Sequence, residues 1–286
     1  MNTEQLLQHF ERISEAPGAI TSLRRFILDL AVRGKMVPQD PSDEPAAELL
    51  KQIAAEKAWL VKTGEIRKPK SLAPISQLPF DPPPGWIWLP LGETGLIQSG
   101  NSINAESRSR LEKTELGYPF IATKDVGYGP DPIIYDNGLK VPLGDLSFKH
   151  ARAESILICA EGGSAGRKIG MTDRDICFGN KLIANEPWSA VVPRLVMYVY
   201  MSGFFYEQFV KQMTGVIGGI SIQKFLRLPF PLPPLEEQHR IVGKVDELMS
   251  LCDQLEAQII VSEQDSRRFL EAVLNEALSP ALAEAT

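Results

Sequence analysis

The 286-residue sequence predicts an α+β fold, in which a central domain with a curled, mainly antiparallel β-sheet and packed helices lies between N-terminal helices and a long C-terminal helix. Three observations predict it. Apolar residues recur at helical spacing before residue 64 and after residue 235. Short β-type runs divided by Gly, Pro, Asp and Asn fill residues 91–228. A proline-rich segment separates the first region from the second.

Residues 1–64 are predicted to form a helical segment. Its helices are expected at residues 3–15, 20–33 and 46–62. Gly34 stands where a left-handed C-terminal cap is favoured after the second helix. Ser42 or Asp43 is expected to cap the third helix, because such side chains accept hydrogen bonds from the free amides of a first turn.

Residues 65–84 are predicted to form a stiff linker. Seven prolines lie between Gly64 and Pro90, and proline fixes φ, so the chain is expected to be extended there. Trp86 and Trp88 follow at alternating positions, which indicates a strand edge anchored by aromatic packing.

Residues 85–230 are predicted to form the central domain. Strands are expected at residues 118–123, 155–159, 168–171, 176–178 and 182–184. One helix is expected over residues 193–213. Its many aromatic side chains suit one buried face, so we interpret them as core rather than as a platform on which bases stack.

Residues 231–286 are predicted to form a single long helix. Pro233 and Pro234 make a rigid lead-in, and the helix is expected over residues 235–278, roughly 65 Å at 1.5 Å per residue. Apolar residues at alternating steps of four and three make a coiled-coil seam. The seam is expected to comprise Ile241, Val245, Leu248, Cys252, Leu255, Ile259, Phe269 and Val273. The alternative is a helix packed on its own chain.

Charge is unevenly distributed along the chain. The net charge is −6, and residues 236–286 hold 4 basic and 11 acidic side chains, whereas the central domain is about neutral. This pattern is compatible with DNA binding but does not indicate it. No apolar run approaches the roughly 20 residues that span a bilayer, so no membrane partner is expected. A cytoplasmic location is expected instead. The three cysteines are expected to be buried thiols.

Two motifs carry a resemblance to a known family. Residues 232–242, read as L-P-P-L-E-E-Q-H-R-I-V, resemble the junction between recognition domain and coiled-coil spacer helix in specificity subunits of type I restriction-modification systems. Residues 23–50 resemble a second block of that family, and residues 81–93 look like the entry to its target-recognition domain. Typical members carry two recognition domains and two spacer helices, whereas this chain shows one of each.

The resemblance implies a non-catalytic DNA specificity subunit. Its expected partners are double-stranded DNA, type I methylation subunits, a restriction subunit in the full assembly, and a second copy of the chain through the C-terminal helix. A half-length subunit would bind half of a bipartite target. No cofactor or metal is expected on this chain, because S-adenosylmethionine and ATP would bind only partner subunits.

Two glycine-rich segments, residues 161–170 and 214–225, are expected to face DNA. The first resembles the Gly-Ser/Thr-x-Gly-Arg turn of recognition domains, although it is also compatible with a plain glycine hairpin. Polar and basic side chains there suit phosphates and base edges. The expected DNA-binding residues are Ser99, Asn101, Lys124, Ser164, Arg167, Lys168, Asn180, Lys181, Thr214, Ser221, Gln223 and Lys224.

Two other function classes stay open. One is a non-catalytic protein-protein scaffold with a coiled-coil helix and no DNA readout. The other is a stand-alone enzyme, for which the expected motifs are missing. An amino-methyltransferase motif would continue D-P-P with Tyr or Phe, but the D-P-P at residues 81–83 continues with Pro84. A restriction-type nuclease would have a carboxylate two residues before a catalytic lysine, but no lysine has Asp or Glu there. The dependence of DNA affinity on salt would separate a DNA reader from a scaffold.

Overall fold

The computed structural model describes residues 18–215 and 218–283, with side chains described up to residue 275. The chain divides into two units. The first, here called the α/β unit, comprises residues 25–244. The described part of the second, here called the helical unit, comprises residues 18–24 and 245–283. The predicted helix at residues 3–15 lies outside the described residues.

The α/β unit holds two four-stranded sheets and one strand pair. The first sheet has the order β2-β9-β6-β7 and is antiparallel throughout. The second has the order β4-β3-β8-β5, with β3 and β8 parallel. The strands are β1 Ile87–Pro90, β2 Gly95–Ser99, β3 Gly117–Ile121, β4 Lys140–Pro142, β5 His150–Ala151, β6 Ile156–Cys159, β7 Ile169–Met171, β8 Ile176–Phe178, β9 Leu182–Pro187 and β10 Pro229–Leu232. The predicted α+β class, with mainly antiparallel pairing, is confirmed.

The five expected strands all form, with small shifts at their ends. Strands β6 and β8 are buried along their whole length, which explains their unbroken apolar sequences. Side chains of both strands build one hydrophobic core together with Ile121, Leu182 and Ala184. Strand β1 pairs with β10 and so brings the two ends of the central domain together. Strands β2, β4 and β5 were not predicted, because they are short or polar.

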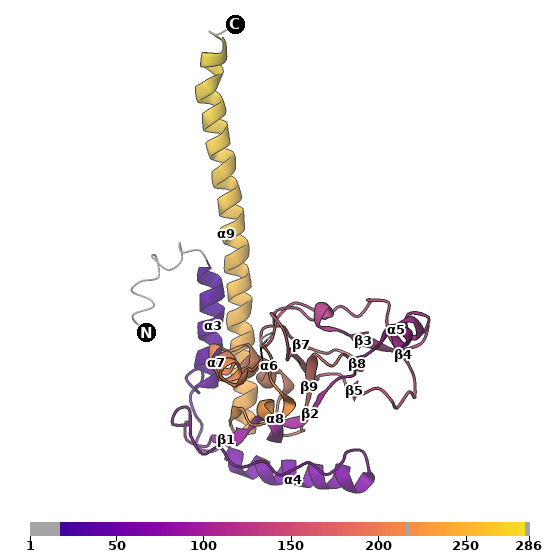
Figure 1. Cartoon of the computed structure of the whole chain (residues 1–286). Coiled ribbons are helices and arrows are strands. Elements are labelled where there is room, and N and C mark those ends of the chain that lie inside the picture. Colours follow the sequence, from indigo (N-terminus) through magenta and orange to yellow (C-terminus); the bar gives the residue numbers. More distant parts are fainter. Residues whose placement is uncertain (1–17, 216–217, 284–286) are drawn as a thin grey trace. The chain divides into compact units, whose positions relative to one another are not determined.

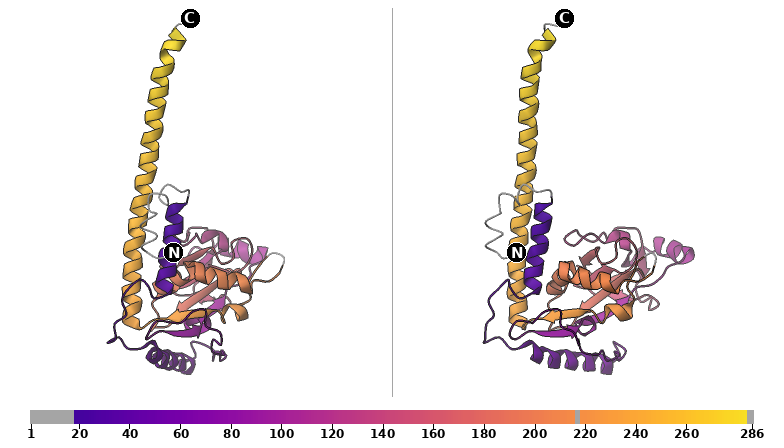
Figure 2. Two further views of the ribbon diagram at one scale, coloured as in Figure 1. Left: turned by 90° about the vertical axis from the view of Figure 1, so that its left-hand side faces the viewer. Right: turned by 60° about the vertical axis from the view of Figure 1, so that its left-hand side comes forward.

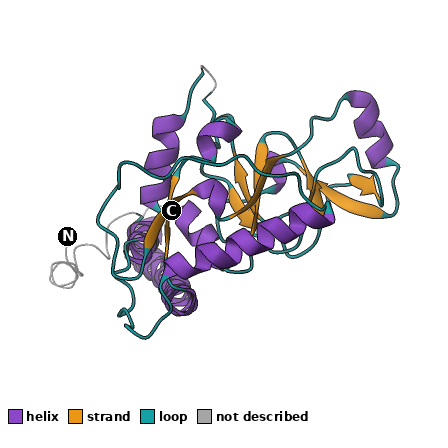
Figure 3. Ribbon diagram, turned by 90° about the horizontal axis from the view of Figure 1, so that it is seen from below, coloured by secondary structure: helices purple, strands orange, loops and turns teal. Residues whose placement is uncertain are grey.

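Six α-helices and two short 3₁₀ turns complete the described part of the chain before residue 233. They are α3 Ala19–Val32, α4 Ala46–Thr63, α5 Ala105–Glu112, α6 Pro193–Met201, α7 Gly203–Gln212, α8 Ile222–Phe225, η1 Leu91–Glu93 and η2 Thr123–Asp125. Within the α/β unit, α5 and β4 lie at the end farthest from α7 (Figure 1). Helix α4 crosses in front of the strands when the molecule is seen from below (Figure 3).

Two local predictions about helices are wrong. Helix α4 is preceded by Pro45 without a side-chain cap, so neither Ser42 nor Asp43 caps it. The single helix expected over residues 193–213 is two helices, because Ser202 adopts an extended backbone and its hydroxyl accepts a hydrogen bond from the Phe205 amide at 3.1 Å. Gly34 does end α3 as expected, with φ of +63°.

The aromatic side chains of α6 and α7 belong to the core, as predicted. Tyr200 stacks on Phe205 with ring centroids 4.6 Å apart, and both are fully buried. Trp88 packs edge-on against Phe80 and also contacts Phe204, which confirms a packing role for this tryptophan. Tyr206 differs, because it is only half-buried and lies beneath the Arg167 guanidinium.

Helix α9, Leu235–Ala283, is one unbroken helix of 49 residues, about 74 Å long (Figure 2). Its first turns are fixed in the α/β unit by the residues of the L-P-P-L-E-E-Q-H-R motif. Gln39 donates a hydrogen bond to the Glu237 carboxylate at 3.0 Å. Arg240 forms a two-pronged ion pair with Asp43, at 2.6 and 3.1 Å.

Gln238 is the most deeply engaged residue of this motif. It is fully buried. Its side-chain oxygen accepts from the Val192 amide at 2.9 Å, and its nitrogen donates to the carbonyls of Ala190 and Pro233 at 3.2 and 3.1 Å. The motif therefore has a structural explanation: it anchors the helix start against the loop before α6.

Replacing Gln238 with alanine is expected to lower the free energy of unfolding by about 3 kcal/mol, because a buried amide and two buried carbonyls lose their partner. Urea denaturation followed by circular dichroism measures this. Gln258→Ala is the matched control, since Gln258 is exposed on the same helix. A loss below 0.5 kcal/mol for Gln238→Ala would contradict this anchoring role.

The predicted seam on α9 divides into two parts. Ile241, Val245 and Cys252 are buried within this chain, so the seam prediction is wrong for these three as contacts with a partner. In the helical unit, Arg24 forms ion pairs with Asp253 and Glu256 at 2.6 and 2.7 Å. From Leu251 onward most apolar side chains of α9 are exposed. Those on one side of the helix are Leu251, Leu255, Ile259, Phe269, Leu270, Val273 and Leu274.

Candidate nucleic-acid interface

The ends of six strands meet at one end of the two sheets. In the first sheet, β2 and β6 finish where β9 and β7 begin, because neighbouring strands are antiparallel: Ser99 pairs with Ile183, and Cys159 with Leu182. In the second sheet, β3 and β8 are parallel and so finish together. We call the surface formed by residues 99–103, 122–124, 160–168, 179–181, 214–215 and 218–224 the strand-end face.

Backbone hydrogen bonds join the loops of this face in series. The Asn180 amide donates to the Asn101 carbonyl at 3.1 Å, the Ala160 amide to the Lys181 carbonyl at 2.8 Å, and the Ile220 amide to the Ala160 carbonyl at 2.9 Å. The two glycine-rich segments therefore lie side by side, as the bridge between residues 161 and 219 also shows. These contacts bring together nine of the twelve expected DNA-binding residues. The other three, Ser221, Gln223 and Lys224, follow Ile220 in the chain at the start of α8 and within it.

Gly166 explains the shape of the first glycine-rich loop. Its φ is +71°, a conformation that side chains rarely adopt, and an added Cβ would lie 2.8 Å from the Phe209 ring. The loop thus passes directly over the aromatic core of α7. Substitution here would displace the loop that carries Ser164 and Arg167.

A cavity of about 230 Å³ opens on the strand-end face. Its apolar floor is formed by Ile103, Phe120 and Leu139, and polar side chains surround the opening. Those polar side chains are Asn101, Ser102, Arg108, Thr123, Lys124, Asn180 and Lys181. Four of the twelve expected residues therefore line a single cavity.

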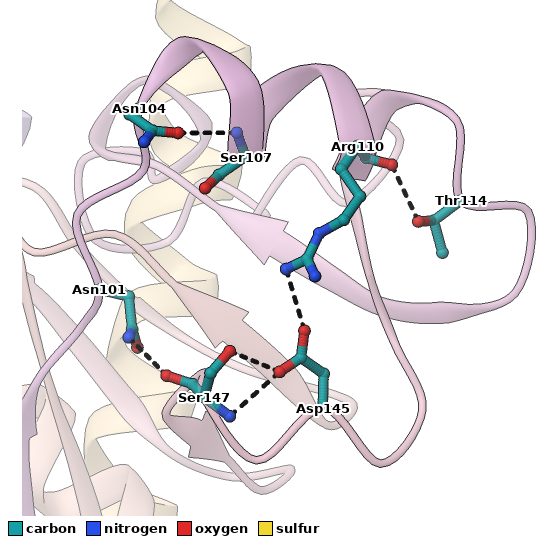
Figure 4. A network of polar contacts seen from close by, with 7 residues as sticks. All are labelled: Asn101, Asn104, Ser107, Arg110, Thr114, Asp145 and Ser147. Carbon is teal, nitrogen blue, oxygen red and sulfur yellow. Dashed lines mark hydrogen bonds and ion pairs between the residues drawn. The ribbon is translucent and has the colours of Figure 1, made fainter.

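Asn101 has a structural role in this face. Its side-chain nitrogen donates to the Ser147 carbonyl at 2.9 Å, and its oxygen accepts from the Lys149 amide at 2.7 Å. Figure 4 shows that the network of hydrogen bonds continues from Ser147 through Asp145 to Arg110 on α5. The Ser147 hydroxyl and amide, together with Arg110, hold the pKa of Asp145 below its ordinary value. Asn101 thus fixes the loop of residues 145–149 rather than offering a free amide.

Several other expected residues also have partners within the chain. Lys168 donates to the Thr123 carbonyl at 3.0 Å, which ties the first glycine-rich loop to η2. Arg167 donates through Nε to the Tyr206 hydroxyl at 2.9 Å, and its guanidinium remains exposed. Ser221 caps α8, and Lys224 donates to the Gln212 carbonyl at 3.2 Å.

A smaller set of side chains is free to meet a ligand. Lys124, Asn180, Lys181 and Gln223 are exposed and, among the described residues, have no side-chain hydrogen bond or ion pair. Thr214 is also exposed, while Ser99 and Ser164 are half-buried. The free ammonium groups suit phosphates, and the Asn180 amide suits adenine in the major groove.

Two basic residues of this region were missed by sequence reasoning. Arg108 on α5 lines the cavity and pairs with Glu112 at 2.9 Å. Lys149 donates to the Ser99 carbonyl at 2.6 Å. The S-R-S-R run at residues 107–110 was a signal for the first, whereas the position of Lys149 depends on the pairing of β5 with β8.

Burial raises the pKa of the Cys159 thiol, which lies beneath the first glycine-rich loop, and raises that of Cys177 to about 12. All three cysteines are buried free thiols, as predicted. Within residues 18–215 and 218–283, no three or more His, Cys, Asp or Glu side chains come together as a metal site. No helix in that part of the chain is long and apolar enough to cross a bilayer.

Comparison with known proteins places this geometry in a family. Residues 83–262 match the type I restriction modification DNA specificity domain. The chain belongs to this family. The EcoAI specificity subunit of a type I restriction enzyme from Escherichia coli is 36% identical over 260 residues, and its EcoEI counterpart from the same organism is 34% identical over 267 residues. The family resemblance stated from the sequence is confirmed.

The chain spans less than half the length of these two relatives. Each alignment takes in 89% of this chain, but only 44% of the EcoAI subunit and 43% of the EcoEI subunit. The HsdS subunit from Thermoanaerobacter tengcongensis shares the fold, with a TM-score of 0.52 at 22% identity over 90% of this chain and 56% of that one. A chain from a type I R-M system gives a TM-score of 0.55 over the same shares, also at 22% identity.

Proposed function

We propose that this chain is a DNA specificity subunit of a type I restriction-modification complex and that it reads half of a bipartite target. The strand-end face is the proposed reading surface. Free cations there would hold phosphates, while Asn180 and Gln223 would meet base edges. The observation that carries the proposal is the gathering of nine expected residues, from distant parts of the sequence, at one end of the sheets in a member of the specificity-domain family.

We further propose that a second copy completes the target. The chain spans less than half of the curated relatives, and the exposed side of α9 that holds Leu251 to Leu274 is mostly apolar, although Ser262 and Ser266 interrupt the seam between Ile259 and Phe269. Pairing of two such faces in antiparallel fashion would place two strand-end faces in a two-fold arrangement and would bury leucine and isoleucine side chains. An inverted, split target follows from that symmetry.

The remaining parts of the complex are proposed on the family relationship. Methylation subunits would bind this chain, and a restriction subunit would join them. S-adenosylmethionine and ATP would bind those subunits, so this chain would act without catalysis or cofactor of its own. Its proposed place of action is the cytoplasm, where cellular DNA is accessible.

The test is the affinity of the intact chain for duplex DNA at several salt concentrations, measured by fluorescence anisotropy. Each neutralised phosphate contributes about −0.9 to the slope of log affinity against log salt, so a DNA reader is expected to show a slope of several negative units. A chain that binds no duplex, or binds with a flat salt dependence, would instead be a protein scaffold.

A further inference from the structure

A second cavity, of about 700 Å³, lies in another part of the α/β unit. The linker residues 73–80 form one wall, and the last turns of α7 form another. Three basic side chains, Arg33, Lys211 and Arg227, line it together with a single carboxylate, Glu207. We call it the linker cavity.

The electrostatics of the linker cavity favour an anion. Arg33, Lys211 and Arg227 are all exposed, and among the described residues no carboxylate lies within ion-pairing distance of any of them. The other polar lining groups are neutral Ser and Gln side chains. Unpaired cations that converge on a polar hollow raise the local concentration of negatively charged ligands.

Aromatic packing fixes the position of Arg33. Its guanidinium lies 5.1 Å from the centre of the Phe80 ring. Phe80 is in turn held edge-on against Trp88 and Phe204, at 4.8 and 5.7 Å, and its carbonyl accepts from the Trp88 indole at 3.1 Å. This arrangement orients the cation before any ligand arrives, which reduces the entropy lost on binding.

The linker cavity continues from the strand-end face. Lys224 donates to the carbonyl of Gln212, and Gln212 lines the cavity. The Arg227 amide donates to the Lys224 carbonyl at 3.2 Å, so the turn after α8 connects the two surfaces directly. A duplex seated on the strand-end face therefore has a further basic surface next to it, along which its backbone can extend.

We propose that the linker cavity binds backbone phosphates of the DNA that flanks the bases read at the strand-end face. This inference rests on the proposed function and extends it: the linker cavity supplies affinity without sequence information, because phosphates are the same at every position. A small phosphorylated molecule has the same chemistry, and the test distinguishes it from DNA.

The test compares the intact chain with the triple variant Arg33→Gln, Lys211→Gln, Arg227→Gln on a duplex that carries the preferred sequence with long flanks. The expected result is a slope of log affinity against log salt that is shallower by about 2 to 3 units, with the sequence preference unchanged. The double variant Lys211→Gln, Arg227→Gln leaves the Phe80 contact intact and is expected to show about 2 units of that change.

The control variant is Arg67→Gln, Lys68→Gln, Lys70→Gln, which makes the same change of charge on exposed linker residues outside this cavity. An unchanged slope in the triple variant, or an equal change in the control, overturns the inference. The inference is also overturned if inorganic phosphate binds the chain tightly without displacing DNA. If even the unsubstituted chain shows no sequence preference, the proposed function fails instead.

Discussion

The double variant Lys124→Ala, Lys181→Ala is expected to bind its target duplex on the order of 100-fold more weakly than the unsubstituted chain at about 0.1 M salt. Both ammonium groups are exposed beside the cavity of the strand-end face and have no ion pair among the described residues. Each lost phosphate contact is expected to cost roughly 1.4 kcal/mol, which is a factor of ten in affinity. The salt slope is expected to become shallower by about 2 units.

The matched control is Lys62→Ala, Lys70→Ala, which removes the same charge from two exposed lysines outside this face. It is expected to change affinity less than threefold. Circular dichroism would show that both variants stay folded, since none of the four side chains is buried. Equal losses in the two variants would mean that net charge, and not the strand-end face, determines binding.

Replacing Leu255 and Ile259 with glutamate is expected to convert a dimer of this chain into a monomer at micromolar concentration. These side chains are 36% and 37% exposed and lie on the apolar side of α9. A carboxylate buried without a partner costs several kcal/mol, and two-fold pairing counts each substitution twice, so the dissociation constant is expected to rise by at least about 100-fold.

Gel filtration with light scattering measures this transition. Val261→Glu is the control, because two residues along a helix turn the side chain about 200° away from Ile259, and Val261 is also exposed. It is expected to leave the dimer intact. A monomeric unsubstituted chain at the same concentration would contradict the proposed pairing of α9.

The sequence predicted those parts of the fold that depend on local patterns. The proline lead-in and the carboxylates after it located the start of α9 at Leu235, and unbroken apolar runs located β6 and β8. The break at Ser202 was missed because the aromatic periodicity continues across it. At Ser202 the backbone is extended, and its hydroxyl donates to the Val199 carbonyl and accepts from the Phe205 amide, which separates α6 from α7.

The candidate site was predicted in its residues but not in its arrangement. Glycine-rich loops and basic side chains were visible in the sequence, whereas their common location depends on long-range contacts that no local pattern encodes: the parallel pairing of β3 with β8 and the bridge between Glu161 and Gly219. For the same reason the sequence could not show that the Asn101 side chain is hydrogen-bonded to Ser147 and Lys149, whereas the Asn180 side chain has no such bond among the described residues.

The seam on α9 illustrates a similar limit. Heptad spacing shows which residues share a side of a helix, but not whether that side meets the same chain or another one. Burial of Cys252 and exposure of Ile259, one heptad later, are settled only by the folded structure.

The central claim is that the strand-end face reads a DNA sequence, and selection from a random duplex pool tests it most directly. The intact chain should enrich one short motif. The Asn180→Ala variant should lose preference at about one base pair while retaining affinity within roughly 1–3 kcal/mol. Enrichment of no motif by the unsubstituted chain, or an unchanged preference at every base pair from the Asn180→Ala variant, would contradict the claim.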